Sequence, residues 1–188
     1  MKFERTVGKE LLRLAGQYPV VTVTGPGQSG KTTLCKHTFP DYSYVSLEDF
    51  HVREFALKDP VGSLDQFENS VVIDEVQNVP KLLSSIQTRV DSISGNGQFI
   101  LTGSSQFGMT ASISQSLAGR TAMVNLLPLS YSELYSNEDP ELDEVLYMGF
   151  YPRIFDQNLD PAEMYSFYVQ TYIERDVRQI LNVQDSIK

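Results

Sequence analysis

Nine consecutive residues, 25–33, contain the spacing Gly-x-x-x-x-Gly-Lys-Thr, which is typical of a loop that binds phosphate groups. We expect the glycines at 25, 27 and 30 to let the backbone curl so that its N–H groups point inward and bind an anion. We expect Lys31 to reach the β- and γ-phosphates of ATP, and the hydroxyl of Thr32 to bind Mg²⁺. The residues predicted to contact the nucleotide are Gly25, Pro26, Gly27, Gln28, Ser29, Gly30, Lys31, Thr32 and Thr33.

Two acids, Asp74 and Glu75, end a short apolar run at residues 70–75 that is typical of a strand buried on both faces. Such a strand is common by itself. A strand of this kind that follows a phosphate loop indicates a functional site, because both segments then meet at the carboxyl edge of one parallel sheet. The pattern therefore predicts a Walker B strand, in which Asp74 holds Mg²⁺ through its water shell and Glu75 orients or deprotonates the attacking water.

Polar residues also follow the apolar run at residues 98–102. If this strand lies beside the Walker B strand, a side chain at its end can contact the γ-phosphate or the attacking water. We choose Ser104 for this sensor role, with Thr102 and Ser105 as alternatives. Ordinary capping of a following helix by Ser104 or Ser105 explains the same pattern equally well.

Arg120 lies between a predicted helix, residues 106–118, and a predicted strand, residues 122–127. A guanidinium at such a corner can reach a nucleotide held by a neighbouring subunit, and arginine fingers of this kind contribute about 10³ to 10⁵ in rate. The spacing alone favours a simpler role, in which a surface arginine neutralises the carboxyl end of a helix.

The elements that must position these residues alternate between strands and helices, which indicates an α/β fold. The apolar periodicity predicts strands at residues 19–24, 42–47, 70–75, 98–102 and 122–127, and helices at residues 5–17, 32–38, 80–93 and 106–118. Residues 50–69 are mixed and favour one or two helices, with residues 59–67 as the best segment. The phosphate loop thus lies where a strand passes into a helix, as its function requires.

Composition limits the classes of protein to which the chain can belong. Hydrophobic residues make up 41% of the 188 residues and charged residues 21%, as in soluble globular proteins. No apolar run approaches the roughly 20 residues that a membrane span needs, and the first ten residues lack the apolar centre of a signal peptide. We therefore expect a cytoplasmic protein with no membrane partner. Cys35 is the single cysteine, so we expect a small core residue and no disulfide.

The formal net charge of −9 argues against broad, sequence-independent binding of nucleic acid, which requires clustered Lys and Arg. An acidic protein that binds a nucleotide must concentrate positive charge locally, and the phosphate loop with Lys31 does so. His37 and His51 show no ligand spacing, so neither a metal site nor a histidine-based catalytic site is proposed around them.

Several ordered motifs resemble those of the prokaryotic AAA-type ATPases that carry an uncharacterised C-terminal domain. The motifs are Gly-Pro-Gly-Gln-Ser-Gly-Lys-Thr-Thr-Leu at 25–34, Val-Val-Ile-Asp-Glu-Val-Gln at 71–77, Phe-Ile-Leu-Thr-Gly-Ser-Ser at 99–105, Ser-Leu-Ala-Gly-Arg-Thr at 116–121 and Leu-Pro-Leu-Ser-Tyr-Ser-Glu-Leu at 127–134. The resemblance implies a P-loop NTPase three-layer sandwich with a five-stranded parallel sheet in the order 5-1-4-3-2, and ATP as the nucleotide. It also implies a homo-oligomer in which Arg120 acts between subunits.

The chain departs from this family in two respects. Gly27 stands where the family is expected to have a basic residue, which weakens the expected contact with phosphate but leaves the motif intact. The chain also stops at Lys188, where family members continue into a second domain, so we expect a fragment. An unidentified protein or nucleic-acid partner is then expected to bind through that missing C-terminal domain.

We expect two parts, a P-loop ATPase core at residues 1–127 and a helical lid at residues 128–188 that begins a truncated C-terminal region. The second part is rich in aromatic residues, and a helix is predicted from Pro161. The residues expected to form its apolar stripe are Tyr165, Tyr168, Val169, Tyr172 and Ile173. This stripe is interpreted as core, with a part of it free to meet the missing domain.

Three functions compete on the sequence. The favoured one is a Mg²⁺-dependent ATPase in which the nucleotide state is coupled to movement of the lid or of a partner. The second is a regulatory switch that binds ATP with little turnover. The third is a small-molecule or nucleotide kinase with lid arginines at 153, 175 and 178, although a Walker B Asp-Glu pair favours water as the acceptor. A GTPase is disfavoured, because the chain lacks an Asn/Thr-Lys-x-Asp motif.

Overall fold

The computed structural model describes residues 3–104, 113, 115–136 and 138–173. These residues form two compact units, of which the first ends at Leu127 and the second begins at Pro128. Most of the predicted helix at 106–118 lies outside the described residues. So do Ser105, an alternative for the sensor, and the predicted lid arginines Arg175 and Arg178.

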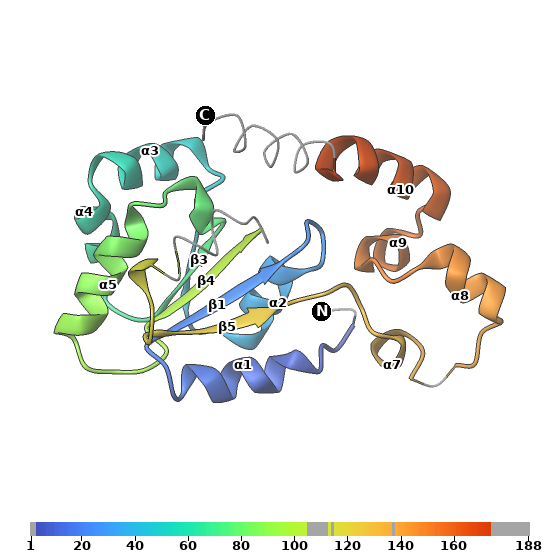
Figure 1. Ribbon diagram of the computed structural model, residues 1–188, viewed down its shortest axis with the longest axis horizontal. Coiled ribbons are helices and arrows are strands. Elements are labelled where there is room, and N and C mark those ends of the chain that lie inside the picture. Colours follow the sequence, from blue (N-terminus) through green and yellow to red (C-terminus); the bar gives the residue numbers. More distant parts are fainter. Residues whose placement is uncertain (1–2, 105–112, 114, 137, 174–188) are drawn as a thin grey trace, which may run out of the picture. The chain divides into compact units, whose positions relative to one another are not determined.

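The first unit is built on a five-stranded parallel sheet in the order β2-β3-β4-β1-β5 (Figure 1). The strands are β1 (Val20–Gly25), β2 (Ser43–Ser46), β3 (Val71–Asp74), β4 (Phe99–Ser104) and β5 (Thr121–Asn125). This order confirms the predicted fold, because it is the order 5-1-4-3-2 read from the other edge. The central strands β1, β3 and β4 are almost completely buried, which explains their continuous apolar sequences.

Alternate residues of the central strands face two separate apolar clusters, one on each side of the sheet. Val71 and Ile73 pack in one cluster with residues of α3, α4 and α5, whereas Val72 packs in the other with residues of α1 and α2. The result is the predicted three-layer sandwich, with helices covering both faces of the sheet. Cys35 is fully buried in the second cluster, which confirms its predicted role as a small core residue.

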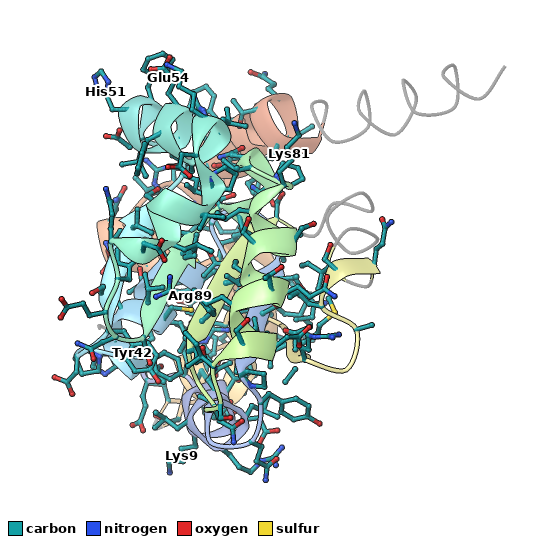
Figure 2. The ribbon with its side chains drawn as sticks, turned by 90° about the vertical axis from the view of Figure 1, so that its left-hand side faces the viewer. Lys9, Tyr42, His51, Glu54, Lys81 and Arg89 are labelled. Carbon is teal, nitrogen blue, oxygen red and sulfur yellow. The ribbon has the colours of Figure 1, made fainter. Side chains whose placement is uncertain are left out.

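Two helices of the first unit, α3 and α4, begin after an aspartate whose side chain accepts hydrogen bonds from free backbone N–H groups. The helices of this unit are α1 (Val7–Ala15), α2 (Lys31–Thr38), α3 (Phe50–Lys58), α4 (Pro60–Asp65), a 3₁₀ turn (Val76–Asn78) and α5 (Leu82–Ser92). Asp49 caps α3, and Asp59 separates α3 from α4 by capping α4 ahead of Pro60. The predicted helix at 59–67 is therefore shorter than expected and follows another helix. Arg89, labelled in Figure 2, joins α5 to Asp65 through an ion pair of 2.8 Å.

The second unit consists of short helices, as predicted for a helical segment. They are α7 (Tyr131–Leu134), α8 (Leu142–Met148), α9 (Pro152–Gln157), α10 (Pro161–Tyr168) and a π-helical turn (Val169–Ile173). Tyr151 packs its ring against Tyr165 and Tyr168. Val169 is 47% exposed, so this residue of the predicted stripe does not lie in the core.

None of the described helices combines the length and the apolar character that crossing a bilayer requires.

Candidate functional site

The carboxyl ends of three neighbouring strands bring the sequence motifs together at one edge of the sheet. Gly25 ends β1 and lies opposite Ser104 at the end of β4, while Asp74 ends β3 on the other side of β4. The phosphate loop follows Gly25 and leads into α2 at Lys31. The loop and the two acids therefore share the edge at which ligands bind in open α/β sheets.

Three residues of the loop adopt left-handed or related backbone conformations, which curl the chain. They are Gly25 (φ 154°), Gln28 (φ 62°) and Gly30 (φ 93°), whereas Gly27, expected to contribute, has no positive φ. A Cβ atom at residue 25 would lie 2.1 Å from the carbonyl oxygen of Leu126, so only glycine fits there. Gly30 precedes the first turn of α2, where free N–H groups and the helix dipole favour an anion.

Lys31 places its ammonium group inside this loop. Its Nζ atom donates hydrogen bonds to the carbonyl oxygens of Gly25 at 3.0 Å and Pro26 at 2.9 Å. The residue is only 6% exposed, and burial lowers the pKa of Lys31, while Glu75 and Asp74 act in the opposite direction. The loop thus holds a cationic group that two of its own carbonyl groups orient.

Thr32 lies beside Asp74, and this pair links α2 to β3. The Thr32 hydroxyl donates to the Asp74 carboxylate, with its Oγ1 3.1 Å from Oδ1 and 3.0 Å from Oδ2. Because the hydroxyl proton points to the carboxylate, the lone pairs of the Thr32 oxygen remain available to a metal ion. Asp74 is buried and also accepts hydrogen bonds from Thr102 and from Tyr44, the latter at 2.8 Å.

Glu75 follows β3 with a left-handed backbone (φ 58°) that starts the 3₁₀ turn. Its N–H donates to Thr102 Oγ1 at 3.3 Å, and its carboxylate accepts a hydrogen bond from the side-chain amide of Gln77. Left-handed conformations are uncommon for residues other than glycine and recur at functional sites. Gln77 of the same turn therefore holds the Glu75 carboxylate, and Thr102 holds the Glu75 backbone.

The segment that contains this site matches a known protein family. A family model described as an AAA domain matches residues 17–135, which include the loop, both acids and Arg120.

The chain belongs to this AAA domain family.

A second family model, for a domain of unknown function, matches residues 139–188 of the AAA protein. An uncharacterized protein of Mycobacterium tuberculosis and one of Mycobacterium bovis are each 30% identical to it over 181 residues. The alignment covers 94% of the chain but only 40% of each mycobacterial protein, so the chain spans less than half the length of these relatives.

Solved structures show the same fold. The Walker-type ATPase PABY2304 of Pyrococcus abyssi superposes with a TM-score of 0.60 at 14% identity, over 98% of this chain and 77% of that chain. AMPPCP-bound DnaA of Aquifex aeolicus gives a TM-score of 0.52 at 15% identity, over 94% of this chain and 66% of that chain. At these identities the likeness establishes the P-loop ATPase fold, and membership of the AAA family supports nucleotide binding.

Polar atoms of the AAA domain's loop fit a ligand rich in hydrogen-bonding groups. Gln28 Oε1, Ser29 Oγ and Ser104 Oγ are buried without a hydrogen-bond partner in the described part of the chain. Buried polar groups are nearly always paired in native proteins, so unpaired ones in the loop and at the neighbouring end of β4 are consistent with a phosphate ligand. Thr102, the rival of Ser104, already bonds both Asp74 and the Glu75 N–H. The sensor role of Ser104 stays a prediction.

The residues around Thr32 and Asp74 also suit Mg²⁺. Within the described ranges, no group of three or more His, Cys, Asp and Glu side chains is arranged to hold a metal ion. Mg²⁺ does not need one at such sites, because it keeps several waters and binds one or two protein oxygens together with phosphate oxygens. A hydroxyl and a carboxylate at the mouth of a phosphate loop match this requirement.

Arg120 lies at the amino ends of the parallel strands, whereas Lys31 lies at their carboxyl ends. Arg120 precedes β5, and the next residue, Thr121, pairs with Val20 at the start of β1. Its guanidinium bonds Asp91 through Nε at 2.6 Å and Nη2 at 2.8 Å, and it bonds the Ala118 carbonyl at 3.0 Å. The ion pair lowers the pKa of Asp91. Arg120 therefore does not join the site of its own chain, and its action on a neighbouring subunit stays a prediction.

Three residues at the site were missed by sequence reasoning. Tyr44 bonds Asp74, Gln77 bonds Glu75, and the buried Arg5 donates to the carbonyl oxygens of Ser29 at 3.0 Å and of Leu127 at 2.8 Å. Only Gln77 carried a local signal, since it follows the acids in the same motif. Arg5 and Tyr44 act across long sequence separations that no local pattern indicates.

Proposed function

We propose that the first unit binds ATP with Mg²⁺ and hydrolyses it to ADP and phosphate. The observation that carries this proposal is the contact of the Thr32 hydroxyl with both oxygens of Asp74, directly after a loop that encloses Lys31. This contact joins a phosphate-binding segment to a carboxylate from another strand, as a metal-bound triphosphate requires.

The residues divide the work of binding between them. The loop N–H groups and the amino end of α2 bind the phosphates, and Lys31 neutralises charge between the β- and γ-phosphates. Lys31 has three N–H donors, of which two contact loop carbonyls, so one is free for phosphate oxygen. Thr32 and, through waters, Asp74 would hold Mg²⁺, which when bound would neutralise further charge on the phosphates.

Glu75 acts on the attacking water. The water oxygen forms a bond to the γ-phosphorus, its proton passes to the Glu75 carboxylate, and the bond to the β–γ bridging oxygen breaks to release ADP. Gln77 orients that carboxylate by donating to it. Ser104 contacts the γ-phosphate through its otherwise unpaired hydroxyl. The positive charge of Lys31 stabilises the negative charge that develops on the phosphate oxygens during the reaction.

The second unit serves as a helical lid, and its movement follows the nucleotide state. Its match to a domain of unknown function and the greater length of the mycobacterial relatives support a partner that binds through the C-terminal region. In an assembly of several copies, Arg120 reaches the nucleotide of a neighbouring subunit. The whole protein then couples hydrolysis to a protein or nucleic-acid partner in the cytoplasm.

A second function, a switch that binds ATP with little turnover, is favoured by one observation. Gln77 holds the Glu75 carboxylate through a hydrogen bond, and a base that is held in this way must be released or realigned before it acts on water. The two functions share the binding site and differ only in the rate of phosphate release.

Phosphate release from ATP in the presence of Mg²⁺ distinguishes them. The wild-type protein is expected to release phosphate with Mg²⁺ and not with EDTA, and Glu75→Gln to bind ATP without releasing phosphate. Glu54→Gln is the matched control, because Glu54 is a surface residue of α3 that pairs with Lys58 (Figure 2). If the wild type binds ATP but releases no phosphate, the ATPase is excluded and the switch is supported. If the wild type neither binds ATP nor releases phosphate, both functions are excluded.

A further inference from the structure

The Asp74 carboxylate accepts hydrogen bonds from three hydroxyl groups that come from three different segments of the chain. Thr32 on α2 and Thr102 on β4 belong to the motifs at the edge of the sheet. The third, Tyr44, comes from the edge strand β2, and its hydroxyl lies 2.8 Å from Asp74 Oδ2. A carboxylate has about four lone-pair positions, so these donors determine its orientation almost completely.

Strand register explains how Tyr44 reaches this carboxylate. Tyr44 lies opposite Val72, and Ser46 lies opposite Asp74, so Tyr44 and Asp74 are diagonal neighbours. Because side chains alternate along a strand, Asp74 faces the same side of the sheet as Val72, which packs in the cluster that contains residues of α2. A long aromatic side chain spans the diagonal distance on that face.

The α2 helix also fixes the ring of Tyr44. The ammonium group of Lys36 lies 3.5 Å from the centre of this ring, a distance at which a cation is attracted to the aromatic face. Thr32 and Lys36 are four residues apart and so share one face of α2. One helix face therefore carries both the hydroxyl expected to bind the metal and the cation that holds Tyr44 in place.

We propose that Tyr44 is a positioning residue that sets the affinity of the site for Mg²⁺ by orienting Asp74 toward Thr32. The proposal rests on the proposed function, because it assigns Tyr44 to the same metal site. Side chains that orient metal-binding groups from outside typically change metal affinity about 10- to 100-fold when they are removed. Tyr44 is 37% exposed, so the loss of its hydroxyl leaves no cavity in the core.

The variant Tyr44→Phe isolates this hydroxyl, since phenylalanine keeps the ring and its contact with Lys36. Tyr42→Phe is the matched control. Tyr42 packs its ring against Phe39 with the centroids 4.9 Å apart, and it is labelled in Figure 2. Binding of a fluorescent ATP analogue is measured at increasing Mg²⁺ concentration and again in EDTA, with thermal unfolding as a check on folding.

Tyr44→Phe is expected to need about tenfold more Mg²⁺ for half-maximal binding, with unchanged affinity in EDTA and a cooperative unfolding transition that shows a folded protein. Tyr42→Phe is expected to follow the wild type. Coincident titrations of Tyr44→Phe and wild type, or equal shifts in both variants, would overturn the proposal. A wild type that binds the analogue equally with and without Mg²⁺ would instead contradict the metal site of the proposed function itself.

Discussion

Thr102 donates its hydroxyl proton to Asp74, one position beyond the last paired residues of β3 and β4. The same oxygen accepts the N–H of Glu75 at 3.3 Å, so one fully buried hydroxyl holds both acids. This contact ties the end of β4 to the two residues on which metal binding and hydrolysis are proposed to depend.

Removing that hydroxyl tests its role directly. We expect Thr102→Val to lower the free energy of unfolding by about 1–3 kcal/mol, because it leaves the Glu75 N–H without its partner. Mg²⁺-dependent nucleotide binding should weaken in parallel, while Thr102→Ser, which keeps a hydroxyl, should retain both. Urea unfolding and a nucleotide titration provide the measurements, and a Thr102→Val protein with wild-type values in both would show that the contact is unimportant.

Gly25 offers a steric test of the loop. Alanine at this position would place Cβ 2.1 Å from the Leu126 carbonyl oxygen, so we expect Gly25→Ala to displace the loop and abolish detectable ATP binding. Gly119→Ala is the matched control, since Gly119 also has a positive φ (74°) but open space around its Cβ position. Its cost should be about 1–2 kcal/mol of backbone strain, with ATP binding retained. Normal ATP affinity in Gly25→Ala would contradict the described loop.

Sequence reasoning recovered those parts of the site that are encoded locally. The phosphate loop and the end of β3 follow from short patterns, because glycine spacing and apolar strand sequences act over a few residues. The order of the sheet came from the resemblance to a family and not from periodicity, which contains no information on strand pairing.

The remaining features depend on tertiary structure. The contacts Tyr44–Asp74 and Arg5–Ser29 join residues far apart in the sequence, and they exist only because of strand register and helix placement. The left-handed conformation of Gln28 was missed for a related reason. The tertiary path of the loop determines which residue takes the positive φ. Composition alone indicated Gly27, whereas Gln28 has this conformation.

Arg120 provides a test for assembly. If it acts between subunits, phosphate release per protomer should rise with protein concentration, and Arg120→Ala should remove that rise. Asp91→Ala breaks the same ion pair but keeps the guanidinium, so it should retain the rise. The measurement is steady-state hydrolysis over a range of protein concentrations. If both variants showed the same dependence of hydrolysis on protein concentration, Arg120 would be only a surface residue that pairs with Asp91.

Cys35 makes stability depend on pH in the alkaline range. Burial raises the pKa of its thiol to about 12, whereas an unfolded cysteine ionises near 8.5. The unfolded state therefore loses its proton first as pH rises, and folding stability falls from about pH 8.5 toward pH 12. Between pH 8 and 10 the wild type should lose about 2 kcal/mol more than Cys35→Ala, measured by urea unfolding. Parallel curves for the two proteins would contradict a buried, protonated thiol.

The loop around Lys31 is proposed to hold the phosphates of ATP, and equilibrium binding of ATP with Mg²⁺ is the measurement that bears on this role first. Lys9→Ala is the control, because Lys9 is an exposed residue of α1 (Figure 2). We expect wild type and Lys9→Ala to bind with the same affinity, and Lys31→Ala to bind about a hundredfold more weakly, as the loss of a charged hydrogen bond predicts. ATP affinity in Lys31→Ala equal to that of the wild type would contradict the account.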